Sequence, residues 1–168
     1  MSAISTRKTD DSYVLVIPLY NGHMTLDLFE FLQGAGVTRV RRILKVIDEE
    51  SWGDVRDKLL DEMESACGRL LDHGLKEAGK ARKARVEEAK SELRDARSAV
   101  VEVKLARKRA DEEGRRQLDI RMQKLKKEAD AAKDRLACAM MDLRAISKGE
   151  VQVLKALEVI KSWATRKK

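Results

Sequence analysis

The sequence contains few of the residues that usually build a large globular core or a disulfide framework. Aromatic residues make up 4% of the 168 residues, and there are one proline and two cysteines. Because charged residues reach 39%, the composition suits solvated helices better than a globular core. Cys67 and Cys138 cannot build a framework of bridges, so they indicate a reducing compartment inside the cell.

Long hydrophobic runs are also missing. Residues 1–12 are polar, which predicts a loose arm and argues against a secretory signal peptide. The apolar run at residues 13–20 is far shorter than the roughly 20 residues that a membrane-spanning helix needs. We therefore expect no membrane span and a cytoplasmic location, with the nucleus as an alternative if the cell is eukaryotic.

Recognisable catalytic and metal-binding motifs are lacking as well. His23 and His73 are not part of an HExxH sequence, and no cysteine pair has the spacing of a zinc site. There is no Walker A or GxGxxG motif, and residues 34–36 alone are too weak a signal for a phosphate-binding loop. We therefore predict a non-enzymatic protein that holds no metal and no cofactor.

What the sequence does contain is two heptad runs. Along the downstream run, apolar or small residues recur at alternating spacings of four and three, which is the a/d pattern of a coiled coil. This run comprises Leu118, Met122, Leu125, Ala129, Ala132, Leu136, Ala139, Leu143, Ile146, Glu150, Val153, Leu157, Ile160 and Ala164. The upstream run mirrors it with Leu71, Leu75, Ala78, Arg82, Val86, Ala89, Leu93, Ala96, Val100, Val103, Arg107 and Ala110.

The two runs match each other if the chain folds back near Gly114. Ala96 then faces Ala132, so that the two helices can approach closely. Leu93 faces Leu136 in a neighbouring layer, where large side chains fill the wider space. Gly114 is expected to be the left-handed C-cap that ends the first helix. The alternative is that the same heptads form a coiled coil between chains.

A β-hairpin is predicted near the N-terminus. Residues 13–20 are rich in β-branched and aromatic residues, and Asn21-Gly22 is a strong signal for a two-residue turn. Pairing across this turn puts Leu19 opposite Met24. It also puts Pro18 at a hydrogen-bonded pair, where its missing N–H is a conflict that a bulge or an early helix would remove.

Residues 37–47 fit two structures. Six of these eleven residues are β-branched, which favours a third strand, while their apolar residues also recur at helical spacing. We favour the strand. Further along, Gly68, Gly74 and Gly79 loosen the first long helix, and Gly149 falls opposite residue 79 in the fold-back register. These glycines mark either a hinge or tolerated surface positions.

The predicted fold is therefore mainly α, a long antiparallel coiled-coil hairpin with a small N-terminal β (or α+β) head. Residues 1–50 form the head, a β-hairpin or meander. Residues 51–168 form the helical hairpin, with its turn near residues 112–116.

Positive charge is the main functional signal. The formal net charge is +7, with 36 basic and 29 acidic residues, which favours an acidic partner. Without aromatic residues to stack on bases, nucleic-acid binding would rest on sequence-blind phosphate contacts. A solvated coiled-coil face is the alternative, because acids are interleaved. The candidate anion or nucleic-acid contacts are Arg39, Arg41, Arg42, Lys104, Lys108, Arg109, Arg115, Arg116, Arg121 and Lys124.

Two further sets of residues carry predictions. The strand at residues 13–20 is apolar on both faces, so the head needs a cover from the helices or from another subunit. The candidate self-association residues are Tyr13, Val14, Val16 and Phe29. Arg82 and Glu150 are oppositely charged residues within the heptad runs, and we expect them to form an ion pair inside the interface.

Together these features predict a coiled-coil scaffold or adaptor protein that presents a basic surface to an acidic partner. We expect a protein partner and a homo-oligomer. The alternative is a nucleic-acid-binding protein that contacts phosphates without sequence specificity, through the basic turn of the hairpin and the head.

Overall fold

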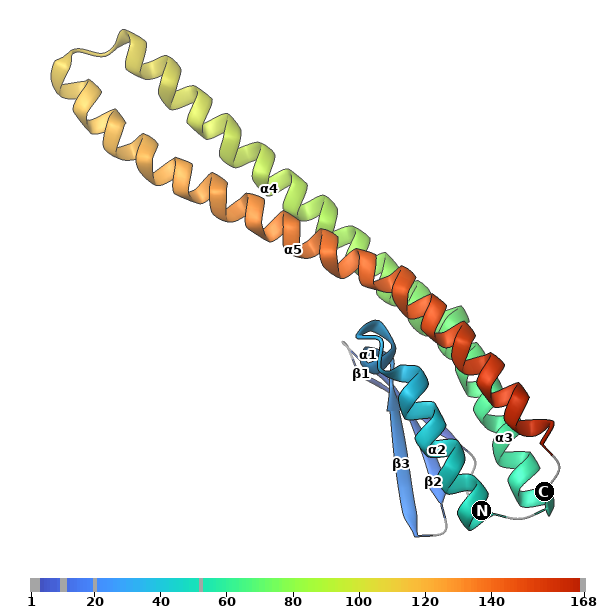
Figure 1. The fold of residues 1–168 in the computed structure, drawn as a ribbon. Helices are drawn as coiled ribbons and strands as arrows, with labels where there is room; N and C mark the ends of the chain where they lie inside the picture. The colour runs from blue at the N-terminus through green and yellow to red at the C-terminus, as the bar shows by residue number, and fades with distance from the viewer. Residues whose placement is uncertain (1–3, 10–11, 20, 52, 167–168) are drawn as a thin grey trace. The chain divides into compact units, whose positions relative to one another are not determined.

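The computed structural model describes residues 4–9, 12–19, 21–51 and 53–166. Three strands precede a series of helices that occupies the rest of the chain (Figure 1). The elements are β1 (Ser5–Thr9), β2 (Ser12–Leu19), β3 (Gly22–Asp27), α1 (Leu28–Leu32), α2 (Gly36–Glu50), α3 (Gly53–Arg69), the π-helical turn η1 (Leu70–Gly74), α4 (Leu75–Arg109) and α5 (Glu112–Ala164). The predicted fold class, mainly helical with a long helix hairpin and a small N-terminal sheet, is confirmed.

The chain divides into two compact units. Residues 1–79 and 144–168 form the first, here called the sheet unit, and residues 80–143 form the second, here called the hairpin unit. The start of the helical region therefore groups with the strands. The predicted division into domains 1–50 and 51–168 stays a prediction.

The sheet is antiparallel, with the strand order β1-β2-β3. Residues 5–9, expected to belong to a loose arm, instead form β1 and pair with β2. In the second hairpin Leu19 pairs with Gly22 and Leu15 with Leu26. The predicted register is therefore wrong by two residues, and Leu19 and Gly22 are the last pair before the turn. Because side chains alternate with a period of two, the shift keeps the same residues on the core face.

The shifted register also removes the conflict at Pro18. In a hairpin closed by a two-residue loop, the closing pair exchanges hydrogen bonds and the next pair does not. Leu19 and Gly22 are the closing pair, so Pro18 and His23 are the next one. Pro18 therefore needs no N–H toward β3, and β1 ends its pairing with β2 at Val16.

Residues 37–47 are helical, so the favoured interpretation of a strand is wrong. They lie inside α2, where Val40, Ile43, Leu44 and Ile47 are all fully buried on one face. The β-branched residues lower helix propensity by only a few tenths of a kcal/mol each. Burial of a continuous apolar face outweighs this cost.

The core of the sheet unit draws on the sheet and on five helices. One sheet face contributes Leu15, Ile17 and Leu26, all fully buried. Gly36 is required at the start of α2, because a Cβ there would lie 2.2 Å from Cδ1 of Phe31. The helical part of this core consists of Leu28, Phe31, Val40, Ile43, Leu44, Ile47, Leu59, Leu60, Met63, Ala66, Cys67, Leu70, Leu75, Ile146, Val153, Ala156 and Ile160.

Two of the glycines expected to mark a hinge or a tolerated surface are packing positions, whereas a Cβ at Gly68 would meet open space and one at Gly79 would lie 3.7 Å from Ile146. Gly74 is buried, and a Cβ there would lie 3.4 Å from the ring of Tyr13. Gly149 is also buried, and a Cβ there would lie 2.8 Å from Leu32 and 3.1 Å from Leu75. A side chain at position 149 would therefore require the ends of the Leu32 and Leu75 side chains to shift.

The π-helical turn η1 widens the helix by one residue between α3 and α4. Leu75 donates its backbone N–H to the carbonyl oxygen of Leu70, five residues earlier. Both leucines are buried, so the wider turn brings two side chains that are five residues apart onto the same face.

In the hairpin unit, α4 and α5 run antiparallel and meet along one stripe (Figure 1). This stripe, here called the seam, is buried or half-buried at the predicted positions. On α4 the seam consists of Val86, Ala89, Leu93, Ala96, Val100 and Val103, and on α5 of Leu118, Met122, Leu125, Ala129, Ala132, Leu136, Ala139 and Leu143.

The turn between the two helices lies at residues 110–111, earlier than the predicted 112–116. Gly114 is not a left-handed cap, since it lies inside α5. Asp111 caps this helix instead, because its Oδ1 accepts the backbone N–H of Gly114 at 2.8 Å. An aspartate that precedes a helix satisfies a backbone donor that would otherwise have no partner.

The predicted ion pair between Arg82 and Glu150 stays a prediction, because the two residues belong to different units. Glu150 is exposed, because the buried stripe of α5 in the sheet unit runs through Ile146, Gly149 and Val153. The buried position of α5 here is Gly149 and not the predicted heptad position Glu150, because Gly149 allows the close approach of Leu32. Arg82 donates Nη1 to the backbone carbonyl oxygen of Asp142 at 2.7 Å.

Candidate anion-binding surfaces

The net charge is concentrated in the hairpin unit. Residues 80–143 contain 19 basic and 13 acidic residues, which gives +6, while the remaining 17 basic and 16 acidic residues give +1. Within the hairpin unit, residues 104–127, here called the tip segment, contain ten basic and four acidic residues, again +6. The excess of positive charge therefore lies around the turn between α4 and α5.

All of the predicted anion contacts in the tip segment are exposed. Two of them make local contacts, since Arg115 donates Nε to the carbonyl oxygen of Ala110 at 3.0 Å and Arg116 pairs with Glu112 at 3.1 Å. The exposed set comprises Lys104, Lys108, Arg109, Arg115, Arg116, Arg121 and Lys124.

One ion pair joins the two helices near the turn. Arg107 donates Nε and Nη2 to the two carboxylate oxygens of Asp119, at 2.6 and 3.2 Å. The hydrogen bond from Arg107 lowers the pKa of Asp119, and the same bond raises the pKa of Arg107. This two-point contact fixes the orientation of the guanidinium plane.

The three predicted anion contacts on α2 have different environments in the structure. Arg39 is half-buried and donates Nε to the carbonyl oxygen of Thr25 at 3.1 Å, so it fastens α2 to the sheet. Arg42 is exposed. Arg41 is exposed as well, and it lines a pocket together with residues from the end of α5.

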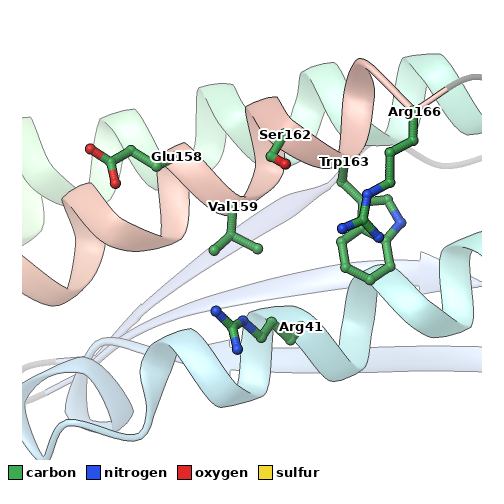
Figure 2. A pocket seen from close by; sticks show the side chains of 6 residues that line it. All are labelled: Arg41, Glu158, Val159, Ser162, Trp163 and Arg166. Carbon is green, nitrogen blue, oxygen red and sulfur yellow. The ribbon is translucent and has the colours of Figure 1, made fainter.

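This pocket, here called the arginine pocket, has a volume of about 440 Å³. Figure 2 shows Arg41 entering from α2 and Arg166 from the residues after α5. The guanidinium carbon of Arg166 lies 4.5 Å from the centroid of the Trp163 ring, within the range of a cation–π contact. The pocket is lined by Arg41, Glu158, Val159, Ser162, Trp163 and Arg166.

A buried polar network holds Trp163 in place. Asp48 accepts the indole N–H of Trp163 through Oδ2 at 2.5 Å and Nε of Arg56 through Oδ1 at 2.6 Å. Arg56 is 6% exposed and donates Nη2 to the backbone carbonyl oxygen of Trp163 at 3.1 Å. The indole ring is therefore a fixed wall of the arginine pocket.

Sequence reasoning did not find the arginine pocket. It singled out Arg41 only as one of several basic residues near the N-terminus. Its neighbour Arg166 belongs to the basic run at the C-terminus, which was a signal, but no local pattern relates the two arginines. Only the packing of α2 and α5 in the sheet unit brings them together.

A second hollow, here called the α4 groove, lies on the hairpin unit and has a volume of about 700 Å³. Its apolar floor consists of Leu93, Val101 and Leu136, and Val101 is 54% exposed. The charged and polar residues around this floor are Lys90, Arg94, Arg97, Ser98 and Glu102. Basic side chains thus outnumber acidic ones at the rim.

The predicted self-association residues lie on different surfaces. Tyr13 is half-buried against the core of the sheet unit. Val14 and Val16 are half-buried on the opposite sheet face, where the paired Thr25 is exposed. Phe29 is 56% exposed on α1. Tyr13 therefore contributes to the core, while Val14, Val16 and Phe29 remain accessible.

The two cysteines differ in environment. Cys67 is buried, and this burial raises the pKa of its thiol to about 12, whereas Cys138 is exposed. Within residues 4–9, 12–19, 21–51 and 53–166, no helix has the length and apolarity to cross a membrane. The same residues hold no group of three or more side chains arranged as metal ligands. Comparison with protein-family models, curated proteins and solved structures found no match to this chain.

Proposed function

We propose that this protein is a non-enzymatic coiled-coil scaffold or adaptor whose basic surface binds an acidic protein partner. The observation that carries the proposal is the charge distribution, because the tip segment alone accounts for +6 of the +7 net charge. Its cations are exposed on two helices that pack through a narrow seam. Such a surface attracts an acidic partner and speeds the encounter.

Exposed aliphatic side chains near the turn support a protein partner. Val101 and Leu105 are one helical turn apart on α4 and are 54% and 53% exposed. Ile120 on α5 is 71% exposed, and Arg116 and Lys124 lie one turn before and after it. Aliphatic side chains among cations suit the apolar face of an acidic amphipathic helix. The α4 groove offers such a helix an apolar floor with a basic rim.

The proposal is tested by reversing charge in the tip segment. The variant carries Lys104→Glu, Lys108→Glu, Arg121→Glu and Lys124→Glu, which takes this segment from +6 to −2. The control reverses four exposed cations of the sheet unit, Lys58→Glu, Arg69→Glu, Lys76→Glu and Lys155→Glu. The probe is a labelled amphipathic peptide with leucine at heptad a and d positions and glutamate elsewhere, followed by fluorescence anisotropy.

We expect the tip variant to lose most of its affinity for this peptide, by at least about tenfold, because several charge-assisted contacts are removed. The control variant should retain most of its affinity. Circular dichroism verifies that both variants remain helical. Equal binding by the tip variant and the unmodified protein would rule out the proposal.

Sequence-nonspecific nucleic-acid binding is the second candidate, because the exposed cations of the tip segment could equally contact phosphates. The two candidates respond differently to loss of the aliphatic side chains. Replacing Val101, Leu105 and Ile120 by serine should weaken binding of the acidic peptide and leave binding of duplex DNA unaffected. A steep fall of DNA affinity with salt, together with no binding of the peptide, would favour nucleic acid.

We propose that the accessible face of the sheet and the exposed Phe29 of α1 contribute to self-association. Val14, Val16 and Phe29 offer apolar surface that a second copy could cover. The variant Val14→Thr, Val16→Thr, Phe29→Ser should then sediment as a smaller species than the unmodified protein. An unchanged sedimentation coefficient would place any contact between copies elsewhere.

A further inference from the structure

We infer that the arginine pocket of the sheet unit is a binding site for an oxyanion, a carboxylate or a phosphate group. The site lies between α2 and the end of α5 (Figure 2). The inference does not depend on the proposed function, which concerns the tip segment of the hairpin unit. Four features of the pocket carry the inference.

The first feature is a rigid aromatic wall. The indole N–H of Trp163 is held by Asp48, and its backbone carbonyl accepts a hydrogen bond from Arg56. Arg56 is itself buried and hydrogen-bonded to Asp48. Trp163 is therefore restrained both at its backbone carbonyl and at its indole nitrogen. The wall therefore exists before any ligand binds.

The second feature is the placement of Arg166 on this wall. Its guanidinium carbon lies 4.5 Å from the ring centroid, within the range of a cation–π contact. This contact holds Arg166 against the wall through the charge of the guanidinium group, and a guanidinium group carries five N–H donors. The contact with the ring therefore positions Arg166 while donors remain for an anion.

The third feature is a second arginine on the same pocket. Arg41 comes from α2 and lies along that helix, with its guanidinium group on the side of Val159 (Figure 2). Neither Arg41 nor Arg166 forms an ion pair with a carboxylate among the residues that the structure describes. Glu158 also lines the pocket, but its carboxylate lies away from both guanidinium groups in this view. An oxyanion between the arginines would accept charge-assisted hydrogen bonds from both.

The fourth feature is the character of the remaining lining. Ser162 supplies a hydroxyl that can donate to an anion, while Val159 and Trp163 are apolar. Apolar walls reduce the local dielectric constant and strengthen the attraction between arginines and an anion. A volume of about 440 Å³ is sufficient for the anionic group together with part of the molecule that carries it.

Trp163 provides a direct readout for the test. A Trp52→Phe background leaves Trp163 as the single indole. Its emission is followed while inorganic phosphate or acetate is added at constant ionic strength, with chloride as the balancing ion. A ligand that bonds Arg166 changes the contact between guanidinium and ring, so we expect a saturable change in emission.

Arg41→Gln and Arg166→Gln test the two donors, and Arg42→Gln is the matched control. Arg42 is the next residue on α2, carries the same charge and does not line the pocket. We expect each pocket variant to weaken binding at least about tenfold, as loss of a charge-assisted bond does. Arg42→Gln should bind as the background protein does. Thermal melting of all three variants verifies that they are folded.

The two probes distinguish the source of the anion. Saturation with phosphate alone supports a phosphate-bearing ligand, and saturation with acetate alone supports a carboxylate, such as the side chain of an acidic peptide. An equal loss of binding in Arg42→Gln would overturn the inference, since it would show a general effect of surface charge. Absence of any saturable change with both probes would overturn it too. The tip variant described above should retain the pocket's binding, so the two proposals fail independently.

Discussion

The two units of this protein bury their side chains to different extents. In the sheet unit, Leu15, Phe31 and Ile160 come from a strand and two separate helices and are all fully buried. In the hairpin unit, the best-buried residues belong to a seam between two helices, and most seam positions of α5 remain half-exposed. A pair of helices can cover only one stripe of each partner.

This difference explains where the charge lies. A packed core restricts which residues can surround it, whereas a narrow seam leaves most helix positions in solvent. The sheet unit is nearly neutral at +1, and the hairpin unit carries +6. We therefore expect the sheet unit to dominate global stability, and the hairpin unit to open locally at lower free energy. Matched residues in the two units allow this comparison to be tested.

The largest difference is expected between two arginines. Arg56→Ala removes a buried guanidinium together with its hydrogen bonds to Asp48, Asp57 and the backbone carbonyl oxygen of Trp163, and we expect the free energy of unfolding to fall by about 3–5 kcal/mol. Arg135 pairs with Glu92 at 2.9 Å, but both side chains are about half exposed, so Arg135→Ala should cost about 0–1 kcal/mol. Urea denaturation measures both values. Equal losses would contradict the contrast between the units.

Two isoleucines of the same helix give the next comparison. Ile160 is fully buried and Ile120 is 71% exposed, both on α5. Ile160→Ala should lower the free energy of unfolding by about 2–5 kcal/mol through the lost burial and the cavity that remains. Ile120→Ala should change it by less than about 0.5 kcal/mol. A large effect at Ile120 in the purified protein would contradict its exposure and would mean that another copy of the chain covers this side chain in solution.

The cysteines predict a smaller effect that depends on pH. Burial raises the pKa of Cys67 from 9.0 to about 12, so the unfolded state releases this proton first as the pH rises. The free energy of unfolding should therefore fall above pH 9, by up to about 1.4 kcal/mol per pH unit, while stability below pH 9 is unaffected.

Denaturation at pH 8 and pH 10 measures this loss. The loss should be smaller in Cys67→Ala and unchanged in Cys138→Ala, since Cys138 is exposed. A thiol reagent gives an independent reading, because it should modify Cys138 at once and Cys67 only on unfolding. Rapid modification of both thiols in the folded protein would contradict the burial of Cys67.

The smallest expected effect concerns the exposed pair Arg107 and Asp119. Arg107→Gln removes the hydrogen bond that lowers the pKa of Asp119, so this pKa should rise toward its usual value. Any stabilisation by the pair is fully present at a pH above the usual pKa of an aspartate. It is lost as the pH falls through the lowered pKa of Asp119. Carboxyl NMR titration measures the change, with Arg121→Gln as the control. An unchanged Asp119 titration in Arg107→Gln would show that the pair does not form in solution.

The seam of the hairpin unit could be predicted from sequence because it depends on local periodicity and on one partner helix. Leu93 and Leu136 lie at the heptad positions that the sequence assigns to them. The same periodicity fails at Glu150, because α5 there packs against α1 as well as against the first helical run. The sequence carries no local signal for this third contact, and Gly149, which permits it, looked like a point of flexibility.

Two other features depended on contacts between distant segments. The β-branched residues of α2 favour a strand locally, and only the shared core turns them into the buried face of a helix. The arginine pocket joins Arg41 with Arg166 through the packing of α2 and α5. Composition identified both residues as parts of basic runs, and it could not pair them.

The π-helical turn η1 has a consequence for how this helix tolerates change. Leu70 and Leu75 are five residues apart, and the wide turn lets both face the core. The wide turn holds one residue more than a regular α-helical turn, so deleting the exposed Asp72 would convert η1 into a regular turn and leave the following side chains of the sheet unit on nearly the same faces. A deletion within α3 would instead rotate every following side chain of that unit by about 100°. We therefore expect the helix to tolerate the loss of one residue at η1 better than the loss of one residue within α3.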